Sequence, residues 1–422
     1  MPDLHELHRH ARAIFSYALS ASDPRPVVRD AISRPKFSTP IYSIAIGKAA
    51  IQMVRGLDDA LGDKLTAGII VSTSLHESAR WQSFTGGHPL PNESSLAAAR
   101  AAFELLDRAN NEQATVLFLI SGGGSAMIEW PISDDISLDD LRSANQTLVS
   151  CGARISEINS VRRAFSAVKG GGLARRAPHA QMFTFIVSDT NRLDEANVAS
   201  GPTLNPPKDA PNAIDIVQHY RLQTVLPDSI MKAVRRAERS SARVSGEYGL
   251  LLDNKTAIVA AHHKANELGF PCSTVYDIRE QPIQSGCEML LASVDYDDFE
   301  RFSSVSGGEF SCRVRGDGRG GRNLETALRC AINLDKRKNT RSHFVVLSAG
   351  TDGIDGNSPA AGAIADETTV ERARNLNLDA KQYLARSDSY TFFEQLNDLI
   401  ITGPTSTNVR DLRILLKSLD RF

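Results

Sequence analysis

The sequence predicts an α/β protein, because short apolar strands alternate with helical patterns along its 422 residues. Each expected strand is rich in Ile, Val, Leu or Phe and leads into a turn that contains Gly, Ser or Asp. Runs that are apolar on both faces are typical of parallel sheets covered by helices on both sides. At about 150 residues per domain, a chain of this length is expected to form two or three domains.

Five strands and three helices follow from these patterns. The strands are Ile41–Ile46, Ala67–Val71, Thr115–Ile120, Phe183–Val187 and Phe344–Leu347. The helices are Ser94–Arg108, Ile158–Lys169, which three glycines follow, and Asp228–Ser240. A second α/β pattern begins near residue 255, so we expect a boundary near 240–250 and domains of 1–245 and 246–422.

The composition argues against a nucleic-acid-binding or membrane protein. Lys and Arg total 48 against 50 Asp and Glu, which leaves a formal net charge of −2 and no basic footprint. No apolar run reaches the roughly 18 residues of a membrane span, and the N-terminus lacks the apolar region of a signal peptide. The five cysteines are scattered without a CxxC pair, which favours reduced thiols over disulfides or zinc. We therefore expect a cytoplasmic protein.

Two features follow expected strands in the first half of the chain. A glycine-rich loop lies between a strand and a helix and consists of Ser121, Gly122, Gly123, Gly124 and Ser125. Its backbone N–H groups suit an anion or phosphate, although a tight turn alone also explains the glycines. Lys48 follows the first strand, at the edge where open α/β sheets bind ligands; a solvated lysine is the alternative.

Further polar groups lie downstream. On the expected helix Ile158–Lys169, one face carries Asn159, Arg162, Ser166 and Lys169, which suits contacts with phosphate oxygens. The alternative is that these cations complement the dipole at the helix C-terminus. Asp189 follows an apolar strand and suits either Mg²⁺ binding or acceptance of a proton from a substrate hydroxyl, with helix capping as the alternative.

A glycine pattern in the second half fits two kinds of site. Gly316, Gly318 and Gly321 satisfy the GxGxxG pattern of dinucleotide-binding proteins. The acidic residue at the matching distance, Asp335, instead lies in a charged loop before the next strand. An oxyanion held by Arg322 at the start of a helix, next to an expected N-cap, is therefore favoured.

Asp352 and Asp355 lie three residues apart in a glycine-rich loop after a strand. This spacing resembles a site for a divalent cation or sugar hydroxyls, although Gly-Asp turns also arise for backbone reasons alone. Glycine-rich or acidic loops at several strand ends, together with several cations, suggest phosphoryl transfer, whose catalysis consists mostly of positioning and charge neutralisation.

These segments resemble, in order and spacing, the glycerate 2-kinases of the MOFRL type (class II glycerate kinases). The matching segments in the first half are IGKAAIQM at 46–53, GGHPLPNESSLAAA at 86–99, LISGGGSAM at 119–127, INSVRRAFSAVKGGGLA at 158–174 and SDT…ASGPT between 188 and 203. Those in the second half are SGGEFSCRVRGDGRGGRNLE at 306–325, GTDGIDGNSPAAGAIAD at 350–366 and TGPTSTNVRDLRILL at 402–416. The resemblance covers nearly the whole chain.

The resemblance implies two α/β domains with the active site in the cleft between them. The first is Rossmann-like with a largely parallel sheet, and the second carries the MOFRL segment. The implied reaction is phosphorylation of D-glycerate to 2-phosphoglycerate, with ATP and Mg²⁺. The alternative is an NAD(P)H-dependent hydroxypyruvate reductase, which only the GxGxxG match supports. The expected partners are this small-molecule substrate and the nucleotide, and a homodimer stays open.

The resemblance also implies roles for individual residues. Catalytic roles fall on Lys48, Asp189, Arg322 and Asp352, of which Asp189 and Asp352 are also the expected metal ligands. ATP phosphates are expected at Ser121, Gly122, Gly123, Gly124, Ser125 and Lys169. Substrate contacts are expected from His88, Arg162, Glu309 and Asn323. The chain departs from the family pattern at Leu193, Leu324 and Ser387.

Overall fold

The computed structural model describes residues 4–34, 37–191, 194–237, 244–293, 299–337 and 342–419, without the side chains of 277 and 280. Leu193 therefore lies outside the described residues. The chain forms two compact units: Pro24–Leu251, and Met1–Asp23 together with Leu252–Phe422. This division differs from the expected domains chiefly at the N-terminus. Residues before Pro24 group with the C-terminal part of the chain because their helix packs on that sheet.

The unit Pro24–Leu251 contains one sheet and nine helices among the described residues, together with two short 3₁₀ segments. The strands are β1 (Ile41–Ile46), β2 (Leu65–Ser72), β3 (Trp81–Thr85), β4 (Thr115–Ser121), β5 (Gln181–Val187) and β6 (Glu247–Leu252). The helices of its first half are α2 (Pro24–Ser33), α3 (Ala50–Leu61), α4 (Glu93–Asn111), α5 (Gly124–Met127) and α6 (Leu138–Ser150). The later helices are α7 (Ile155–Phe165), α8 (Gly172–Arg175), α9 (Ala213–His219) and α10 (Asp228–Arg236), and the 3₁₀ segments are η1 (Gly62–Lys64) and η2 (Glu195–Ser200).

The sheet of this unit has the order β3-β2-β1-β4-β5-β6, and β1 to β5 run parallel. Every residue of β1 and β4 is buried. The side chains of Tyr42, Ile44 and Ile46 join a core with α4, whereas α3 contacts the same strands outside that core. Strands this apolar need helices on both faces, so the predicted α/β class with a parallel sheet is confirmed.

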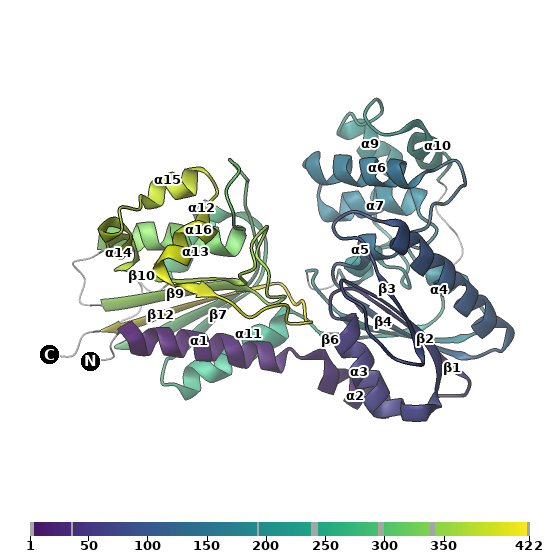
Figure 1. The fold of residues 1–422 in the computed structure, drawn as a ribbon, viewed down its shortest axis with the longest axis horizontal. Coiled ribbons are helices and arrows are strands. Elements are labelled where there is room, and N and C mark those ends of the chain that lie inside the picture. The colour runs from purple at the N-terminus through teal and green to yellow at the C-terminus, as the bar shows by residue number, and fades with distance from the viewer. Residues whose placement is uncertain are drawn as a thin grey trace. The chain divides into compact units, whose positions relative to one another are not determined.

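Four helices of this unit, α6, α7, α9 and α10, form a separate apolar cluster (Figure 1). The helix expected at Ile158–Lys169 ends at Phe165, because the chain then pairs with the segment around Pro131. The amide of Ala167 donates to the carbonyl oxygen of Trp130 at 2.8 Å. The predicted single helical face that includes Ser166 and Lys169 is therefore wrong.

The second unit also contains one six-stranded sheet. Its strands are β7 (Cys272–Pro282), β8 (Arg301–Ser311), β9 (Ser342–Gly350), β10 (Gly362–Asp366), β11 (Leu399–Ile400) and β12 (Asp411–Leu419). Its helices are α1 (Leu4–Ala21), α11 (Asn254–Glu267), α12 (Ile283–Ala292), α13 (Arg322–Leu334), α14 (Thr369–Asn375), α15 (Ala380–Ala385) and α16 (Ser389–Leu396), with a 3₁₀ turn η3 (Asp335–Arg337).

This sheet is mixed, with the order β11-β10-β9-β12-β8-β7. Its strand β12 runs antiparallel to both neighbours, β8 and β9, whereas β7 and β8 are parallel. Helices α1 and α11 pack together on one face, and α13 lies on the other with α12 and α16 (Figure 1). Both units thus combine a helix-covered sheet with buried central strands.

The N-terminal helix α1 is held to its sheet by apolar and charged contacts. Its residues Leu7 and Ile14 are fully buried, and the His8 imidazole lies 2.8 Å from the carboxylate of Asp366. The Asp366 carboxylate also accepts hydrogen bonds from Thr368 and lies 3.7 Å from the guanidinium of Arg372. Burial raises the pKa of Asp366, but these partners more than compensate and lower it to about 2.

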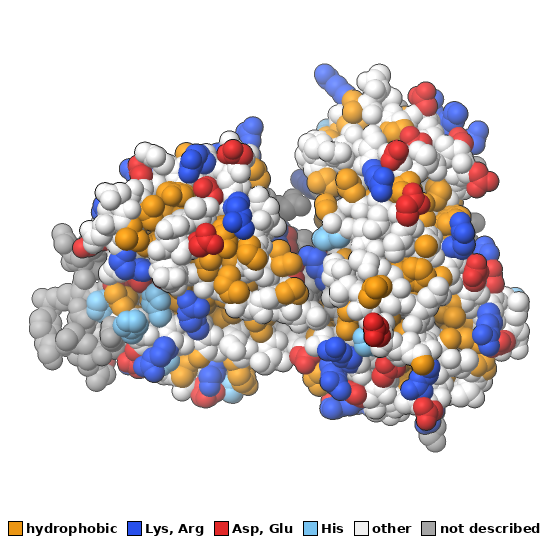
Figure 2. All heavy atoms as spheres, viewed as in Figure 1, with side chains coloured by type: hydrophobic (Ala, Val, Ile, Leu, Met, Phe, Trp, Pro, Cys, Tyr) orange, Lys and Arg blue, Asp and Glu red, His pale blue; other side chains and the backbone are white. Residues whose placement is uncertain are grey.

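No helix in the described part of the chain has the length and apolarity to span a membrane. On the face shown in Figure 2, acidic and basic side chains are interspersed over both units. This distribution agrees with the near-neutral net charge of −2.

We expect Asp366→Asn to destabilise its unit most strongly near neutral pH. A carboxylate whose pKa falls from 3.8 to about 2 on folding stabilises the fold above pH 3.8, and that contribution is lost as the pH falls through 2. The corresponding loss is about 2 kcal/mol. Urea unfolding between pH 2.5 and pH 7, with the exposed Asp30→Asn as control, measures it. Parallel stability profiles of the parent and Asp366→Asn would contradict this role.

Candidate functional site

Several predicted residues lie at one edge of the parallel sheet. Ile46 at the end of β1 pairs with Ile120 in β4, which in turn pairs with Ile186 in β5. Lys48, the glycine-rich loop 121–125 and Asp189 therefore follow three neighbouring strands at the same edge. His88 follows β3 at this edge, and its side chain is exposed.

The ends of β1 and β4 approach so closely that only glycine fits at position 47. A Cβ atom there would lie 2.4 Å from the carbonyl oxygen of Ser121, and Gly47 has a φ of +114°. The Ser121 hydroxyl donates to the Ile46 carbonyl at 3.1 Å, and the Lys48 amide donates to the Gly122 carbonyl at 2.9 Å. These contacts fix the backbone of Lys48 to the glycine-rich loop.

The Lys48 side chain lies against the same loop. A Cβ atom added to Gly123 would stand 3.0 Å from the Lys48 Cγ and 3.3 Å from its Cε. The side chain is half-buried, so its aliphatic part packs on the loop. Lys48 and the loop therefore form one feature that combines a cation with a glycine turn.

Backbone amides of this loop are positioned for an anion. Helix α5 starts at Gly124, and the first N–H groups of a helix have no acceptor within it. Within the described residues, the amides of Gly123, Gly124 and Ser125 donate no hydrogen bond to another segment. The Ser125 hydroxyl lies 2.9 Å from that of Ser200. This arrangement fits the predicted phosphate contact, which remains a prediction.

Lys169, predicted to contact ATP, forms a buried ion pair within the chain. Its ammonium group bonds to the carboxylate of Glu129, and both side chains are only 1% exposed. The same carboxylate accepts a hydrogen bond from the Ser166 hydroxyl. Burial lowers the pKa of Lys169, which the charge of Glu129 opposes.

Arg162, a predicted substrate contact, is likewise buried, and its Nε donates to the Asn145 side chain at 2.7 Å. The Asn145 amide in turn donates to the Leu141 carbonyl at 2.8 Å. In this structure Arg162 therefore ties α7 to α6.

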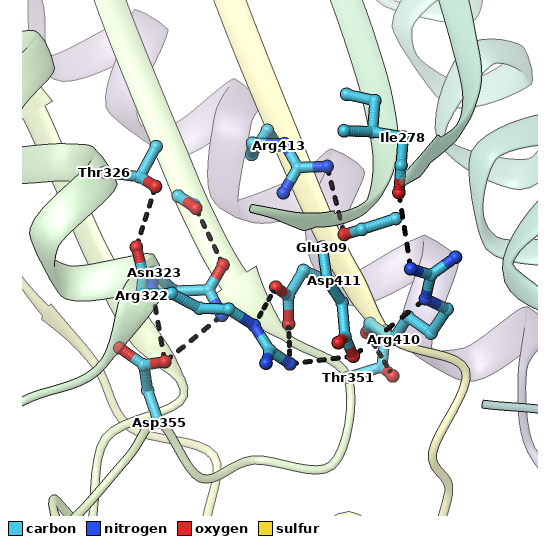
Figure 3. Close-up of polar contacts among 12 residues, drawn as sticks. Ile278, Glu309, Arg322, Asn323, Thr326, Thr351, Asp355, Arg410, Asp411 and Arg413 are labelled. Atoms are coloured by element: carbon cyan, nitrogen blue, oxygen red, sulfur yellow. Dashed lines mark hydrogen bonds and ion pairs between the residues drawn. The ribbon is translucent and has the colours of Figure 1, made fainter. Parts of the chain in front are cut away.

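The second unit brings the predicted residues Glu309 and Asn323 close to Arg322 (Figure 3). In the sheet register, Asp411 at the start of β12 lies opposite Gly308 in β8 and Gly350 in β9. The Arg322 Nε lies 2.5 Å from the Asp411 carboxylate, and its Nη2 lies 2.8 Å from the Glu309 carboxylate. The predicted residues Arg322 and Glu309 are thus direct partners.

Opposite charges in this cluster keep Arg322 protonated and Asp411 deprotonated, as the directions of their pKa shifts indicate. Burial lowers the pKa of Arg322, but the charges of Asp411 and Glu309 outweigh it and raise the pKa above its ordinary value. Burial raises the pKa of Asp411, and the opposing charge of Arg322 holds it below its usual range. The Arg322 side chain is 37% exposed, so part of the guanidinium can still meet a ligand.

The N-cap of α13 differs from the prediction. Gly321, not Asn323, is the N-cap residue, and the carboxylate of Asp355 accepts hydrogen bonds from the amides of Asn323 and Leu324 at 3.1 and 2.8 Å. The Asn323 side chain is buried between Asp355 and Ser348, at 3.3 and 2.8 Å. Burial raises the pKa of Asp355 to about 7. Asp355 thus caps a helix, and Asn323 has internal partners.

Asp352 lies just beyond β9 and is half-buried, with its carboxylate accepting the Ile354 amide at 3.2 Å. No group of three or more potential metal-binding side chains occurs among the residues that the structure describes. Mg²⁺ commonly uses only one or two carboxylates together with substrate phosphates. A single carboxylate such as that of Asp352 or Asp189 has the hard oxygen atoms that Mg²⁺ prefers, and a metal role for either residue stays a prediction.

The GxGxxG segment has no room for a dinucleotide phosphate. A Cβ atom at Gly318 would lie 2.5 Å from the Cβ of Asp388, so this loop packs on the segment before α16. The amides of Gly318, Arg319 and Gly320 donate to Arg386, Asp388 and Asn357 at 3.2, 3.0 and 2.7 Å. The glycines therefore serve close backbone packing.

The sequence patterns did not reveal the structural roles of three acidic residues in these networks, Glu129, Asp355 and Asp411. Glu129 and Asp411 were not singled out, and Asp355 was considered only as a cation or hydroxyl ligand. Asp411 lies in a matched segment at 402–416, where alternation of charged and apolar residues is a signal for a strand with one polar face. No local signal identifies Glu129 as the partner of Lys169.

Comparisons with known proteins cover almost the whole chain. Residues 10–235 match a domain of unknown function, DUF4147, and residues 302–411 match the MOFRL family. A D-glycerate 2-kinase of Thermotoga maritima is 32% identical over 98% of this chain and 99% of its own. A protein of Agrobacterium vitis named putative hydroxypyruvate reductase is 33% identical over 96% of this chain and 93% of its own. The crystal structure of a Thermotoga maritima glycerate kinase superposes with a TM-score of 0.85 at 31% identity, covering 98% of this chain and 99% of that one.

We expect Glu129→Ala to destabilise the unit Pro24–Leu251 by about 3–5 kcal/mol, because it leaves a buried ammonium without a partner. The double variant Glu129→Gln with Lys169→Met removes both charges and should recover much of this loss. Urea unfolding measures both effects. If Glu129→Ala were as stable as the parent, the buried ion pair would be refuted.

Proposed function

The chain belongs to the glycerate kinase family built from DUF4147 and MOFRL domains, and from this premise we propose that it phosphorylates D-glycerate. The γ-phosphoryl group of ATP passes to the C2 hydroxyl, which loses its proton, and the products are 2-phosphoglycerate and ADP. The observation that carries this proposal is the match to a D-glycerate 2-kinase over 98% of the chain.

Lys48 and the glycine-rich loop suit the transferred phosphoryl group. Catalysis of phosphoryl transfer consists mainly of positioning and of stabilising charge on the phosphoryl oxygens. The close approach at Gly47 holds the Lys48 backbone on the loop, and the amides of Gly123 and Gly124 start a helix beside it. A cation and backbone donors fixed in this way need little rearrangement when the transition state forms.

Arg322 suits the anionic substrate. Its guanidinium forms ion pairs with the buried Asp411 and with the more exposed Glu309, and it remains partly exposed itself. A carboxylate or phosphate oxygen of the substrate or product can bond to the remaining N–H groups of Arg322, because a guanidinium has five donors.

The two aspartates at strand ends take different roles. Asp189 follows a rigid buried strand and is proposed as the general base for the glycerate hydroxyl, whereas Asp352 lies in a glycine-rich loop and is proposed to bind Mg²⁺ or hydroxyl oxygens. We expect Asp189→Asn to lower kcat at saturating Mg²⁺, and Asp352→Asn chiefly to raise the Mg²⁺ or glycerate requirement. If excess Mg²⁺ restored Asp189→Asn, the two roles would have to be exchanged.

The reductase alternative rests on the name of a relative and on the GxGxxG pattern. The amides of Gly318, Arg319 and Gly320 are occupied by partners within the chain, so the pattern provides no pyrophosphate site. Assays of the purified protein with hydroxypyruvate and NADH or NADPH distinguish the two functions.

We expect 2-phosphoglycerate as the product of ATP and D-glycerate. Coupling to enolase without phosphoglycerate mutase detects this isomer directly, and NMR of the product confirms the position of the phosphate. A 3-phosphoglycerate product would overturn the assignment of the C2 hydroxyl, and oxidation of NADH with hydroxypyruvate would favour the reductase.

We expect Lys48→Ala to lower kcat by about 10²–10³-fold with little change in stability, because the cation contacts charge that develops during transfer. For Arg322, Arg322→Lys is the better variant, because it retains a charge beside the buried Asp411. It should lower kcat/KM for glycerate. Near-normal turnover of a folded Lys48→Ala protein would exclude its proposed role.

A further inference from the structure

The unit Pro24–Leu251 contains a pocket of about 380 Å³, and Lys48, the glycine-rich loop 121–125 and Asp189 are not part of its lining. Its walls come from the end of α7, the turn before α8, and the loop between η2 and α9. The volume is within the range of small-molecule sites, about 300–1,000 Å³. None of the roles inferred so far accounts for this pocket.

The described lining carries cations without acids. Arg163, Arg175, Lys208 and Lys169 line the pocket, and no Asp or Glu does. Only Lys169 has a carboxylate partner, the buried Glu129, so its charge is already balanced. Among the described residues no ion pair involves Arg163, Arg175 or Lys208. The pocket therefore carries a net positive charge.

The two arginines are half-buried, and hydrogen bonds fix both of them. Arg163 donates to the Ser160 hydroxyl at 2.8 Å, and Arg175 donates to the Gly170 carbonyl at 2.7 Å. Burial lowers the pKa of Arg163 to about 10 and also lowers that of Arg175, and no acid contributes to either shift. Each guanidinium keeps further N–H donors for an anion.

The remaining wall is apolar and rigid. Pro206, Pro207 and Pro211 line it together with alanines of α7 and α9. Asn205 and Asn212 add amide groups at the same wall. Flat apolar surface beside a few polar groups is typical of sites that hold a ring system.

A chain of hydrogen bonds joins this pocket to the glycine-rich loop. The Ser125 hydroxyl meets Ser200 at 2.9 Å, and Ser200 donates to the Asn159 side chain at 2.9 Å. Asn159 and Arg163 both donate to the side-chain oxygen of Asn197, at 3.4 and 3.5 Å. One layer of side chains thus connects the proposed phosphate loop to an arginine of the pocket.

We propose that this pocket holds the nucleoside part and the adjoining phosphates of the phosphoryl donor, a nucleoside triphosphate. The apolar wall takes the base, and Arg163, Arg175 and Lys208 bind phosphate oxygens. Lys169 shapes the wall through its bond to Glu129 and carries no free charge. This inference rests on the proposed kinase function, because only a nucleotide donor requires such a site.

The test uses two single variants of the full chain, Arg175→Gln and Lys208→Glu. Each removes a positive charge from the pocket, and neither side chain has an ion-pair partner among the described residues. Calorimetric titration with the non-hydrolysable analogue adenylyl imidodiphosphate and Mg²⁺ measures binding, and steady-state kinetics measures KM for ATP and for glycerate. Loss of one charge-assisted hydrogen bond should weaken nucleotide binding about tenfold or more. The KM for ATP should rise accordingly, while the KM for glycerate stays unchanged.

Arg176→Ala is the matched control, because Arg176 is next to Arg175 but is exposed and paired with Asp107 at 2.6 Å. It should bind the analogue like the parent. Normal analogue binding by both pocket variants, in a parent protein that phosphorylates glycerate, would overturn the inference and leave the proposed function intact. The inference would also be overturned if the pocket variants lost affinity for inorganic tripolyphosphate but not for the nucleotide analogue. The pocket would then hold a different polyanion. A parent that binds the analogue through these residues but does not phosphorylate glycerate would instead refute the proposed function.

Discussion

The end of β1 approaches the end of β4 so closely that no Cβ atom fits at Gly47, and the arrangement of the glycine-rich loop depends on this contact. A side chain at Gly47 would meet the carbonyl oxygen of Ser121 at 2.4 Å. Because the strands are adjacent and parallel, the Lys48 amide reaches Gly122 and the Lys48 side chain lies on Gly123. The position of the cation thus follows from the strand order rather than from the loop alone.

Lys169 and Arg322, two predicted cations that form ion pairs, differ in how deeply they are buried. The side chains of Lys169 and Glu129 are each only 1% exposed, so their two charges compensate each other. The Arg322 side chain is 37% exposed and forms an ion pair with the buried Asp411, so part of its guanidinium stays accessible. Breaking either pair leaves an uncompensated buried charge, which is far more costly than loss of a surface pair.

The two glycine-rich segments show that similar patterns have different physical causes. In the loop 121–125 the glycines permit a sharp strand-to-helix turn whose first amides donate to no other described segment. In the segment 316–321 they permit close packing against residues 386–389, and the amides of Gly318, Arg319 and Gly320 donate to Arg386, Asp388 and Asn357. Only the partner of each amide distinguishes an anion site from a packing contact, and for Arg319 and Gly320 that partner lies 69 and 37 residues away in the sequence.

The sequence by itself determined the α/β class, five strand positions and the strand-end location of Lys48, the glycine-rich loop and Asp189, because these depend on local hydrophobic runs and turns. Strands β3, β6, β7, β10, β11 and β12 were not predicted. Of these, β12 is a buried strand that carries the charged residues Asp411 and Arg413. Tertiary structure alone decided that α1 joins the C-terminal sheet, that α7 stops at Phe165, and that Lys169 pairs with Glu129. Each of these depends on a partner distant in sequence, and local propensity carries no information about such partners.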